Sequence, residues 1–307
     1  MEVAVSRLVI CCLCALVLTA VVAGQDEDRI PTLEELDAAN PVRPLPERMV
    51  GHDLSLAETS RPPDPERARL GRWLYYDTRL SGDGTLSCAS CHRPENGFSE
   101  PTPVSTGIRG QKGGRKAPSF LNAAFAFYPA TFWDGRAADL EEQAVGPISN
   151  PIEMGATHVG VVRAIAAVDS YRHYFEQAFG DDEVTIERIA SAIAAYERTR
   201  ISGNSDYDRW LEYDEEEDGP LDEPILTPEQ DLGRELFFGD AKCATCHVGN
   251  HFTDSLYHNL GIGWDAETET FADEGRFVVT GEGADKGAFK TPGLREVTKR
   301  APYMHDG

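Results

Sequence analysis

A five-residue motif, Cys-x-x-Cys-His, occurs twice in the 307-residue chain and constrains its fold more than any other feature. The first copy is CASCH at 88–92, and the second is CATCH at 243–247. Two thiols three positions apart, with an imidazole directly after them, suit three kinds of chemistry. They can form a redox dithiol, bind zinc, or attach a c-type haem through two thioethers with the histidine as axial iron ligand.

Haem attachment accounts for all five positions of the motif. A redox dithiol does not require the histidine, and neither copy lies in a strand-then-helix setting. Zinc would need both cysteine pairs in one site, yet the two copies lie about half the chain apart, far beyond the usual ligand spacing. We therefore predict two covalently bound haem c groups. The predicted attachment residues and iron ligands are Cys88, Cys91 and His92 for the first haem, and Cys243, Cys246 and His247 for the second.

The N-terminus has the layout of a secretory signal peptide over residues 1–24. Arg7 precedes an apolar run over 8–22, and small residues then lead into a polar segment. The apolar run is short for a membrane span, and an uncleaved anchor is the alternative. Of the seven cysteines, cleavage leaves only those of the two motifs. We therefore expect an exported, periplasmic protein.

The charge of the chain restricts its partners. A formal net charge of −23 argues against nucleic acid and against anionic membrane surfaces, because both would repel the protein. Acidic residues are densest in YDEEEDGPLDEP, 213–224. We interpret this segment as a solvated linker, with a docking patch for a basic partner as the alternative.

An internal repeat precedes each motif. PERARLGRWLYYD at 65–77 and PEQDLGRELFFGD at 228–240 share a Pro-Glu start, a Leu-Gly-Arg and a leucine followed by two aromatic residues. Asp64 or Thr227 can cap a helix whose first residue is proline, so both copies are predicted helices. The repeat predicts two related domains.

The rest of the chain agrees with a mostly α fold. Apolar residues recur at helical spacing in 185–201, and strand-like alternation is scarce. We predict two related cytochrome c-like domains, each with one covalently bound c-type haem. The expected boundaries are a signal peptide at 1–24, an N-terminal extension at 25–60, a first haem domain at 61–212, an acidic linker at 213–226, and a second haem domain at 227–307.

Three further stretches carry a resemblance to a known family: GRKAPSFLN (114–122), FWDGRAADLEEQAVGPISNPIEM (132–154) and FKTPGLREVTKRAPYMHDG (289–307). With both motifs, they make residues 60–307 similar to the bacterial di-haem cytochrome c peroxidase superfamily, which includes MauG-type enzymes that oxidise a partner protein. The resemblance implies that the first haem is peroxidatic and that the second stores and relays an electron.

The resemblance also implies roles for two residues. Trp133 of FWDGR would lie between the haems, where simple core packing is the alternative. Glu153 of NPIEM matches the carboxylate above the first haem, although an isolated glutamate is ordinarily a solvated side chain. A carboxylate within hydrogen-bond reach of bound peroxide can accept a proton from one oxygen and return it to the other. Both residues are therefore predicted to be catalytic.

The sequence departs from the family pattern at three places. Ile108 stands where many members have a histidine that blocks the first haem, so we expect an open distal face. Lys116 stands where an asparagine often helps to hold calcium, and its ammonium would repel the ion, so calcium is doubtful. The distal ligand of the second haem, Met or Tyr, usually follows the final motif, so we expect a truncated chain. Met154 and Met304 are not expected to replace that ligand.

These features together predict a peroxidase that reduces hydrogen peroxide with electrons from a small redox protein, either a cytochrome c or a cupredoxin. The first alternative is a MauG-like oxidase that uses peroxide to oxidise Trp or Tyr residues of a protein substrate. The second is a non-catalytic electron carrier with two six-coordinate haems. A homodimer is compatible with all three.

Overall fold

The computed structural model describes residues 31–125, 130–213, 218 and 221–307. The chain divides after Ala39 into two compact units, and helix α1 (Leu33–Ala39) is the regular element of the first. The predicted signal peptide lies outside the described residues, as do 214–217 and 219–220 of the predicted acidic linker.

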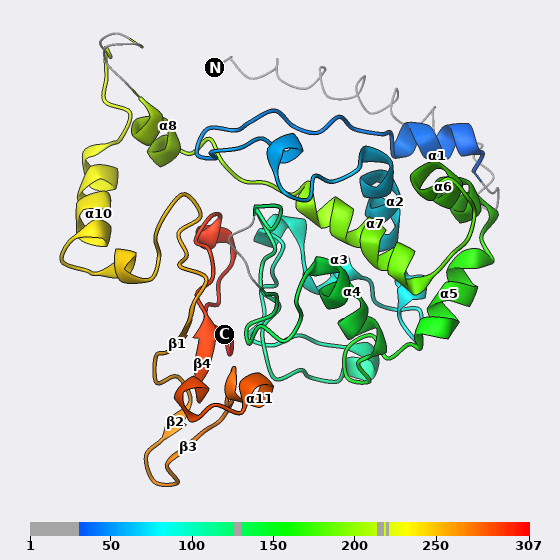
Figure 1. The fold of residues 1–307 in the computed structure, drawn as a ribbon. Coiled ribbons are helices and arrows are strands. Elements are labelled where there is room, and N and C mark those ends of the chain that lie inside the picture. The colour runs from blue at the N-terminus through cyan, green and yellow to red at the C-terminus, as the bar shows by residue number, and fades with distance from the viewer. Residues whose placement is uncertain (1–30, 126–129, 214–217, 219–220) are drawn as a thin grey trace, which may run out of the picture. The chain divides into compact units, whose positions relative to one another are not determined.

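The unit over 40–307 is mostly helical, as predicted, and its few strands are short (Figure 1). Its described α-helices are α2 (Pro65–Tyr75), α3 (Cys88–Cys91), α4 (Leu140–Ser149), α5 (His158–Ala166), α6 (Asp169–Phe179), α7 (Ile186–Arg198), α8 (Asp206–Glu212), α10 (Pro228–Phe238) and α11 (Phe277–Thr280). Its strands are β1 (Tyr257–Asn259), β2 (Trp264–Asp265), β3 (Thr270–Phe271) and β4 (Ala288–Lys290).

The main core forms where α2 crosses α7, with α4 packed on α7 and α6 on α2. Leu70 and Leu74 of α2 are fully buried. Gly71 permits the close approach of the two helices, because a Cβ atom there would lie 1.8 Å from the Ala192 carbonyl oxygen of α7. At the end of α2, Tyr75 packs with Phe120 against Cys88 and donates a short hydrogen bond to the His92 carbonyl. This core therefore fixes the position of the first motif.

The two repeated helices begin as the sequence predicts. The Asp64 side chain accepts a hydrogen bond from the Arg67 amide at 2.9 Å, with Pro65 as the first residue of α2. Thr227 caps α10 in the same way, and its own amide bonds Gln230 Oε1 at 2.8 Å in a capping box. Each cap satisfies amides that a helix start leaves without intrahelical partners.

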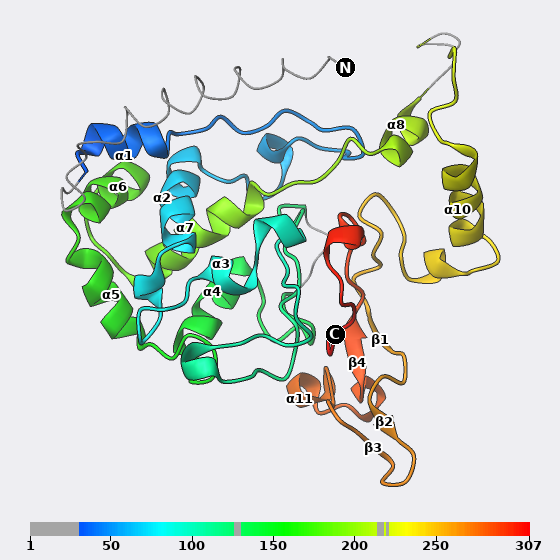
Figure 2. The same cartoon turned by 180° about the vertical axis from the view of Figure 1, so that it is seen from behind.

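Beyond α10, the chain forms short elements. The motif-bearing turn η5 (Cys243–Thr245) follows α10, and antiparallel strands pair as β1 with β4 and β2 with β3. Tyr257 is opposite Lys290 in the first pair. Figure 2 shows α10 and the strands apart from the helices around α7, as Figure 1 does from the other side.

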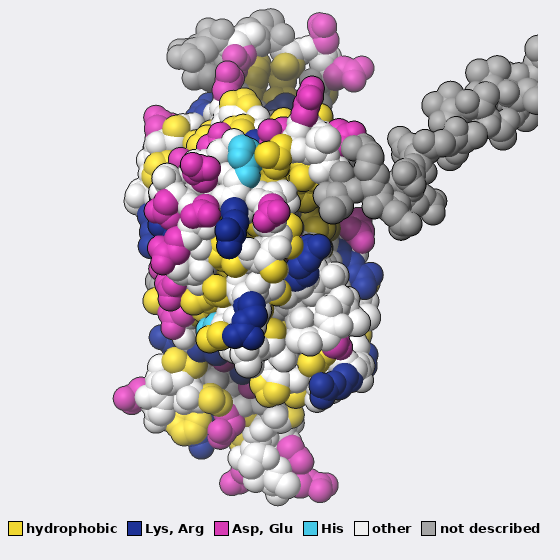
Figure 3. Space-filling view, turned by 90° about the vertical axis from the view of Figure 1, so that its right-hand side faces the viewer, with side chains coloured by type: hydrophobic (Ala, Val, Ile, Leu, Met, Phe, Trp, Pro, Cys, Tyr) yellow, Lys and Arg dark blue, Asp and Glu magenta, His cyan; other side chains and the backbone are white. Residues whose placement is uncertain are grey.

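On the face shown in Figure 3, acidic side chains gather mainly along one edge and at the top and bottom, and lysine and arginine side chains lie over the middle among polar and apolar atoms. Within the described part of the chain, none of the helices combines the length and the apolar character needed to cross a bilayer.

Candidate active site

The first motif lies on α3, a single turn that places two thiols and an imidazole on a cavity wall. Ser87 and Ser90 form a capping box that fixes the start of this turn. His92 follows the turn, and its Nδ1 lies 3.2 Å from the Phe98 carbonyl oxygen, which can only accept. Nδ1 therefore carries the proton, and burial lowers the pKa of the ring. The lone pair of Nε2 is left for a metal ion.

The cavity beside this motif has a volume of about 120 Å³ and is lined by Cys88, Cys91, His92, Trp133 and Glu153 among others. The structure thus brings the predicted residues of the first site to one cavity. Burial raises the pKa of the Cys88 thiol to about 12 and that of Cys91 to about 11. Reactive dithiols usually have lowered thiol pKa values, and burial shifts these two thiols in the opposite direction.

Glu153 is the carboxylate of this cavity. It follows α4 in a tight turn, where its amide bonds the Asn150 carbonyl at 3.1 Å and its carbonyl accepts from the Ile108 amide at 2.8 Å. Asn150 Nδ2 donates to Glu153 Oε1 at 2.9 Å. Burial raises the pKa of Glu153, and Arg136 and Asn150 offset part of the rise. A half-buried carboxyl group whose pKa is raised by burial is suited to accept and return a proton.

The second motif has the same local design. His247 Nδ1 lies 2.9 Å from the Phe252 carbonyl oxygen, so Nε2 is again left with its lone pair. Cys243, Cys246 and His247 line a larger cavity of about 430 Å³, a volume typical of cofactor sites. The described residues do not bring the two cysteine pairs into one metal-binding group, since the group that forms is Cys246, Asp254 and His258. Among the described residues, the four motif cysteines therefore do not form one tetrahedral thiolate group.

Trp133 belongs to the walls of both cavities, together with Lys116 and Pro118. Its indole Nε1 donates to the Lys116 carbonyl at 2.8 Å, and its own carbonyl accepts from the Lys290 amide at 2.8 Å. Trp133 is half-buried, with one hydrogen bond from its ring and one to its backbone carbonyl. Trp133 is therefore part of the wall that the two cavities share, and its bridging role stays a prediction.

The structure also shows where the residues lie that depart from the family pattern or were considered as substitute ligands. Ile108 is buried, and its Cδ1 points to Gly155, where a Cβ atom would lie 2.3 Å away. Among the described residues that line the first cavity, His92 is the one histidine. Met154 lines that same cavity, and Met304 lines the second.

Comparisons with known proteins agree with this geometry. The family model of the di-haem cytochrome c peroxidases matches residues 65–216. Over 246 residues, the chain is 41% identical to the cytochrome c551 peroxidase of Nitrosomonas europaea, covering 80% of this chain and 70% of that protein. The chain belongs to the di-haem cytochrome c peroxidase family.

Two further relatives show the range of this family. The methylamine utilization protein MauG of Methylorubrum extorquens is 37% identical over 249 residues, covering 81% of this chain and 67% of that protein. The crystal structure of a MauG-like protein associated with microbial copper homeostasis is similar with a TM-score of 0.71 and 31% identity, covering 92% of this chain and 79% of that one. The mostly helical fold is therefore that of di-haem peroxidases.

The sequence alone did not point to three other residues that line the first cavity of this di-haem peroxidase: Arg136, Gln143 and Glu197. Gln143 is four residues before Pro147 on α4, and both line the cavity, so helical spacing within LEEQAVGPIS was an available signal. Glu197 is buried on α7, and burial raises its pKa to about 8. Nothing in the local sequence distinguishes it from a solvated glutamate.

Proposed function

We propose that this peroxidase reduces hydrogen peroxide in the first cavity with electrons that a small redox protein delivers to the second. The observation that carries the proposal is the shared wall: two cavities, each with a Cys-x-x-Cys-His motif, meet at Trp133, and the proton-transfer group Glu153 lies in the first. The relative from Nitrosomonas europaea, named as a cytochrome c551 peroxidase, supports the same activity.

The residues present fit two covalently attached haems. Each cavity offers two free thiols for thioether bonds and one imidazole whose Nδ1 is engaged and whose Nε2 is available. Cys88, Cys91 and His92 would hold the first haem, and Cys243, Cys246 and His247 the second. A bound haem supplies an iron centre that exchanges single electrons and coordinates small ligands.

Glu153 supplies the proton chemistry. Reduction of hydrogen peroxide to two waters consumes two electrons and two protons, and the O–O bond breaks readily only when the departing oxygen is protonated. The Glu153 carboxylate takes the proton from one peroxide oxygen and delivers it to the other. The hydrogen bond from Asn150 holds Oε1 in place, which leaves the other carboxylate oxygen for this transfer.

Trp133 supplies the connection between the two cavities. Its indole is fixed by the hydrogen bond to the Lys116 carbonyl, and no other large aromatic side chain lines both cavities in the described structure. A fixed, polarisable ring in the shared wall shortens the path of an electron through space. We therefore assign Trp133 the role of an electron relay.

The resting ferric protein tests the open first site. We expect a high-spin component in its spectrum, and reaction with peroxide without prior reduction, because His92 is the one histidine in the lining and Ile108 points to Gly155. Electron paramagnetic resonance and stopped-flow absorbance measure the two properties. A wholly low-spin spectrum would contradict this expectation and would direct attention to Met154.

A MauG-like oxidation of a protein substrate is the second candidate, and the isoleucine at position 108, where a blocking histidine is often found, favours it. The two functions differ in what the enzyme oxidises: a small redox protein in the peroxidase, and Trp or Tyr residues of a protein substrate in the oxidase. Steady-state turnover of peroxide with a reduced cytochrome c or cupredoxin supports the peroxidase. Slow turnover with every donor, together with oxidation of Trp or Tyr residues in a co-purified protein, supports the oxidase.

Calcium is not required in this proposal, because Lys116 takes the place of a cation. The Lys116 side chain is buried, and its Nζ donates to the Glu100 carbonyl, in a short hydrogen bond, and to the Thr102 carbonyl at 3.4 Å. We expect peroxidase activity and spectra to be unchanged after exhaustive dialysis against EDTA. A loss of activity that added calcium restores would show that a calcium site exists despite this lysine.

The domain boundaries and the location of the enzyme complete the proposal. We assign residues 61–212 to the peroxidatic domain and 227–307 to the electron-accepting domain, with 213–226 as the linker. Haem c attachment to an exported chain places the enzyme in the periplasm, where the predicted signal peptide would send it.

A further inference from the structure

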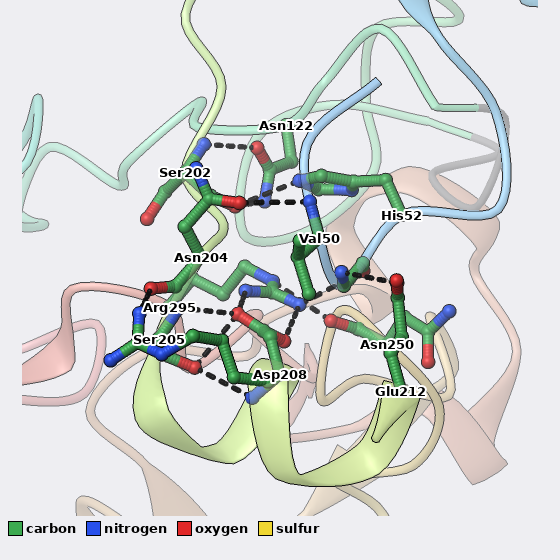
Figure 4. Close-up of polar contacts among 12 residues, drawn as sticks. Val50, His52, Asn122, Ser202, Asn204, Ser205, Asp208, Glu212, Asn250 and Arg295 are labelled. Carbon is green, nitrogen blue, oxygen red and sulfur yellow. Dashed lines mark hydrogen bonds and ion pairs between the residues drawn. The ribbon is translucent and has the colours of Figure 1, made fainter. Parts of the chain in front are cut away.

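Three segments that are remote in sequence meet at Arg295. They are the loop over 50–53, helix α8, and the loop over 248–254 that follows the second motif (Figure 4). Arg295 lies in FKTPGLREV, and its side chain is only 7% exposed. We define these segments with Arg295 as the Arg295 joint.

Four hydrogen bonds fix the guanidinium group. Nη1 and Nη2 each donate to a different carboxylate oxygen of Asp208, both at 2.8 Å. Nε donates to the Asn250 carbonyl at 2.8 Å, and Nη2 also donates to the Gly51 carbonyl at 3.1 Å. Such a planar fork matches a carboxylate in both position and charge, which a lysine ammonium cannot do. The joint is therefore specific for arginine.

Asp208 is equally committed. Its side chain is 1% exposed, and its Oδ2 also accepts from the Ser205 amide at 2.9 Å and the Ser205 hydroxyl at 2.7 Å in the capping box of α8. Gly51 has a φ of +91°, and a Cβ atom there would lie 2.2 Å from Asp208 Oδ1. The loop over 50–53 thus reaches the ion pair only because residue 51 is glycine.

The joint is connected directly to the second axial histidine. The loop over 248–254 closes on itself through the bond from the Thr253 amide to the Val248 carbonyl at 2.9 Å. Arg295 holds this loop at the Asn250 carbonyl, and its guanidinium carbon lies 5.8 Å from the ring centre of Phe252. The Phe252 carbonyl is the acceptor for His247 Nδ1. Arg295 is therefore linked to the His247 imidazole through this one loop: Arg295 bonds Asn250, and Phe252 of the same loop bonds His247.

We propose that Arg295 is a positioning residue for His247, acting through the Phe252 carbonyl, and that it thereby sets the reduction potential of the second haem. The inference rests on the proposed function, because it needs a haem on Cys243 and Cys246. A firmly held acceptor strengthens the Nδ1 hydrogen bond, which makes the imidazole a more basic ligand and favours oxidised iron. A less firmly held Phe252 carbonyl would therefore raise the reduction potential of the second haem.

The test is a redox titration of the holoprotein carrying Arg295→Lys. Lysine keeps the charge beside Asp208 but cannot hold Asp208, Asn250 and Gly51 at once. We expect the one-electron equilibrium of the second haem to shift toward the reduced form by about tenfold, or about 59 mV. The wave of the second haem is assigned in a parallel titration of the Cys88→Ala/Cys91→Ala variant.

Arg48→Lys is the matched control. Arg48 forms a similar fork with Glu212 of α8, at 2.9 and 3.1 Å, and bonds the His52 carbonyl of the same N-terminal loop. Its hydrogen bonds in the described part of the chain go to Glu212 and His52 and not to the loop over 248–254, so the potential should stay at the unaltered value. An unchanged potential in Arg295→Lys, or an equal shift in Arg48→Lys, overturns the proposal.

A second variant covers a failure of Arg295→Lys to fold. Asp208→Asn retains Arg295 and its bond to Asn250, and should give an upward shift of the same sign but smaller size. No shift in that variant counts against the proposal. Failure of the proposed function is seen separately, as absence of two haems or of peroxide turnover in the unaltered chain.

Discussion

Replacement of Glu153 by glutamine is expected to slow the reaction of the ferric protein with hydrogen peroxide by about 10²–10⁴-fold, the usual contribution of a positioned proton-transfer group. Glutamine keeps the size of the side chain and can still pair with Asn150 through its amide oxygen, so haem content and the resting spectrum should be nearly unchanged. Stopped-flow absorbance after mixing with peroxide measures the rate. A variant that reacts as fast as the unaltered enzyme would remove Glu153 from the mechanism.

The pH dependence gives the same prediction a second readout. Burial raises the pKa of Glu153 above its usual value. A proton acceptor must be ionised to act, so the rate should increase with pH as Glu153 loses its proton, at a pH above the usual range of a glutamate. The glutamine variant cannot titrate, and its rate should lack this rise. An identical rise in both proteins would assign it to another group.

Trp133→Phe is the contrasting variant. Phenylalanine fills most of the volume but loses the hydrogen bond to the Lys116 carbonyl and is harder to oxidise than the indole. The first reaction with peroxide should keep its rate, whereas electrons from a reduced donor should reach the first site slowly. Donor oxidation during turnover separates the two steps. Equal losses in both steps would indicate that Trp133 serves only to pack the cavity wall.

Local signals in the sequence were enough to predict the parts of the site that depend on spacing. The spacing within the first motif is enough to place its cysteines and histidine together, because they lie on one helical turn. The caps at Asp64 and Thr227 likewise begin helices where the sequence predicts them. Glu153 and Trp133 came from resemblance alone. Both side chains line the first cavity, and their catalytic roles stay predictions.

The parts that the sequence did not predict depend on contacts between remote segments. Repeated sequences suggested similar surroundings for α2 and α10, yet Leu70 of α2 is fully buried whereas its counterpart Leu232 is 56% exposed. The difference arises because α7 covers α2, while a Cβ atom at Gly233 of α10 would meet no described atom from outside its own helix within 4 Å. Arg295 and Asp208 are likewise ordinary charged residues until folding brings them together.

Removal of the first pair of attachment cysteines is expected to have the largest effect of all. Cys88→Ala with Cys91→Ala leaves His92 in place but removes both thioether bonds, so the purified chain should carry one covalent haem and its peroxidase activity should be lost. Alanine replaces two half-buried thiols without adding volume, so the aromatic packing of Tyr75 and Phe120 should persist. Intact mass and haem staining after denaturing electrophoresis count the haems.

The same substitution at Cys243 and Cys246 makes the control, because it also leaves one haem but in the other cavity. In that variant the first haem should still react once with peroxide, since Glu153 and His92 are untouched, yet turnover with a reduced donor should fail for lack of the second haem. The two variants thus separate peroxide chemistry from electron delivery. Neither variant should do both, because each keeps only one haem. If both variants react with peroxide at the same rate, the first cavity is not the peroxidatic one. If the unaltered chain carries zinc in place of haem, the interpretation of both motifs is wrong.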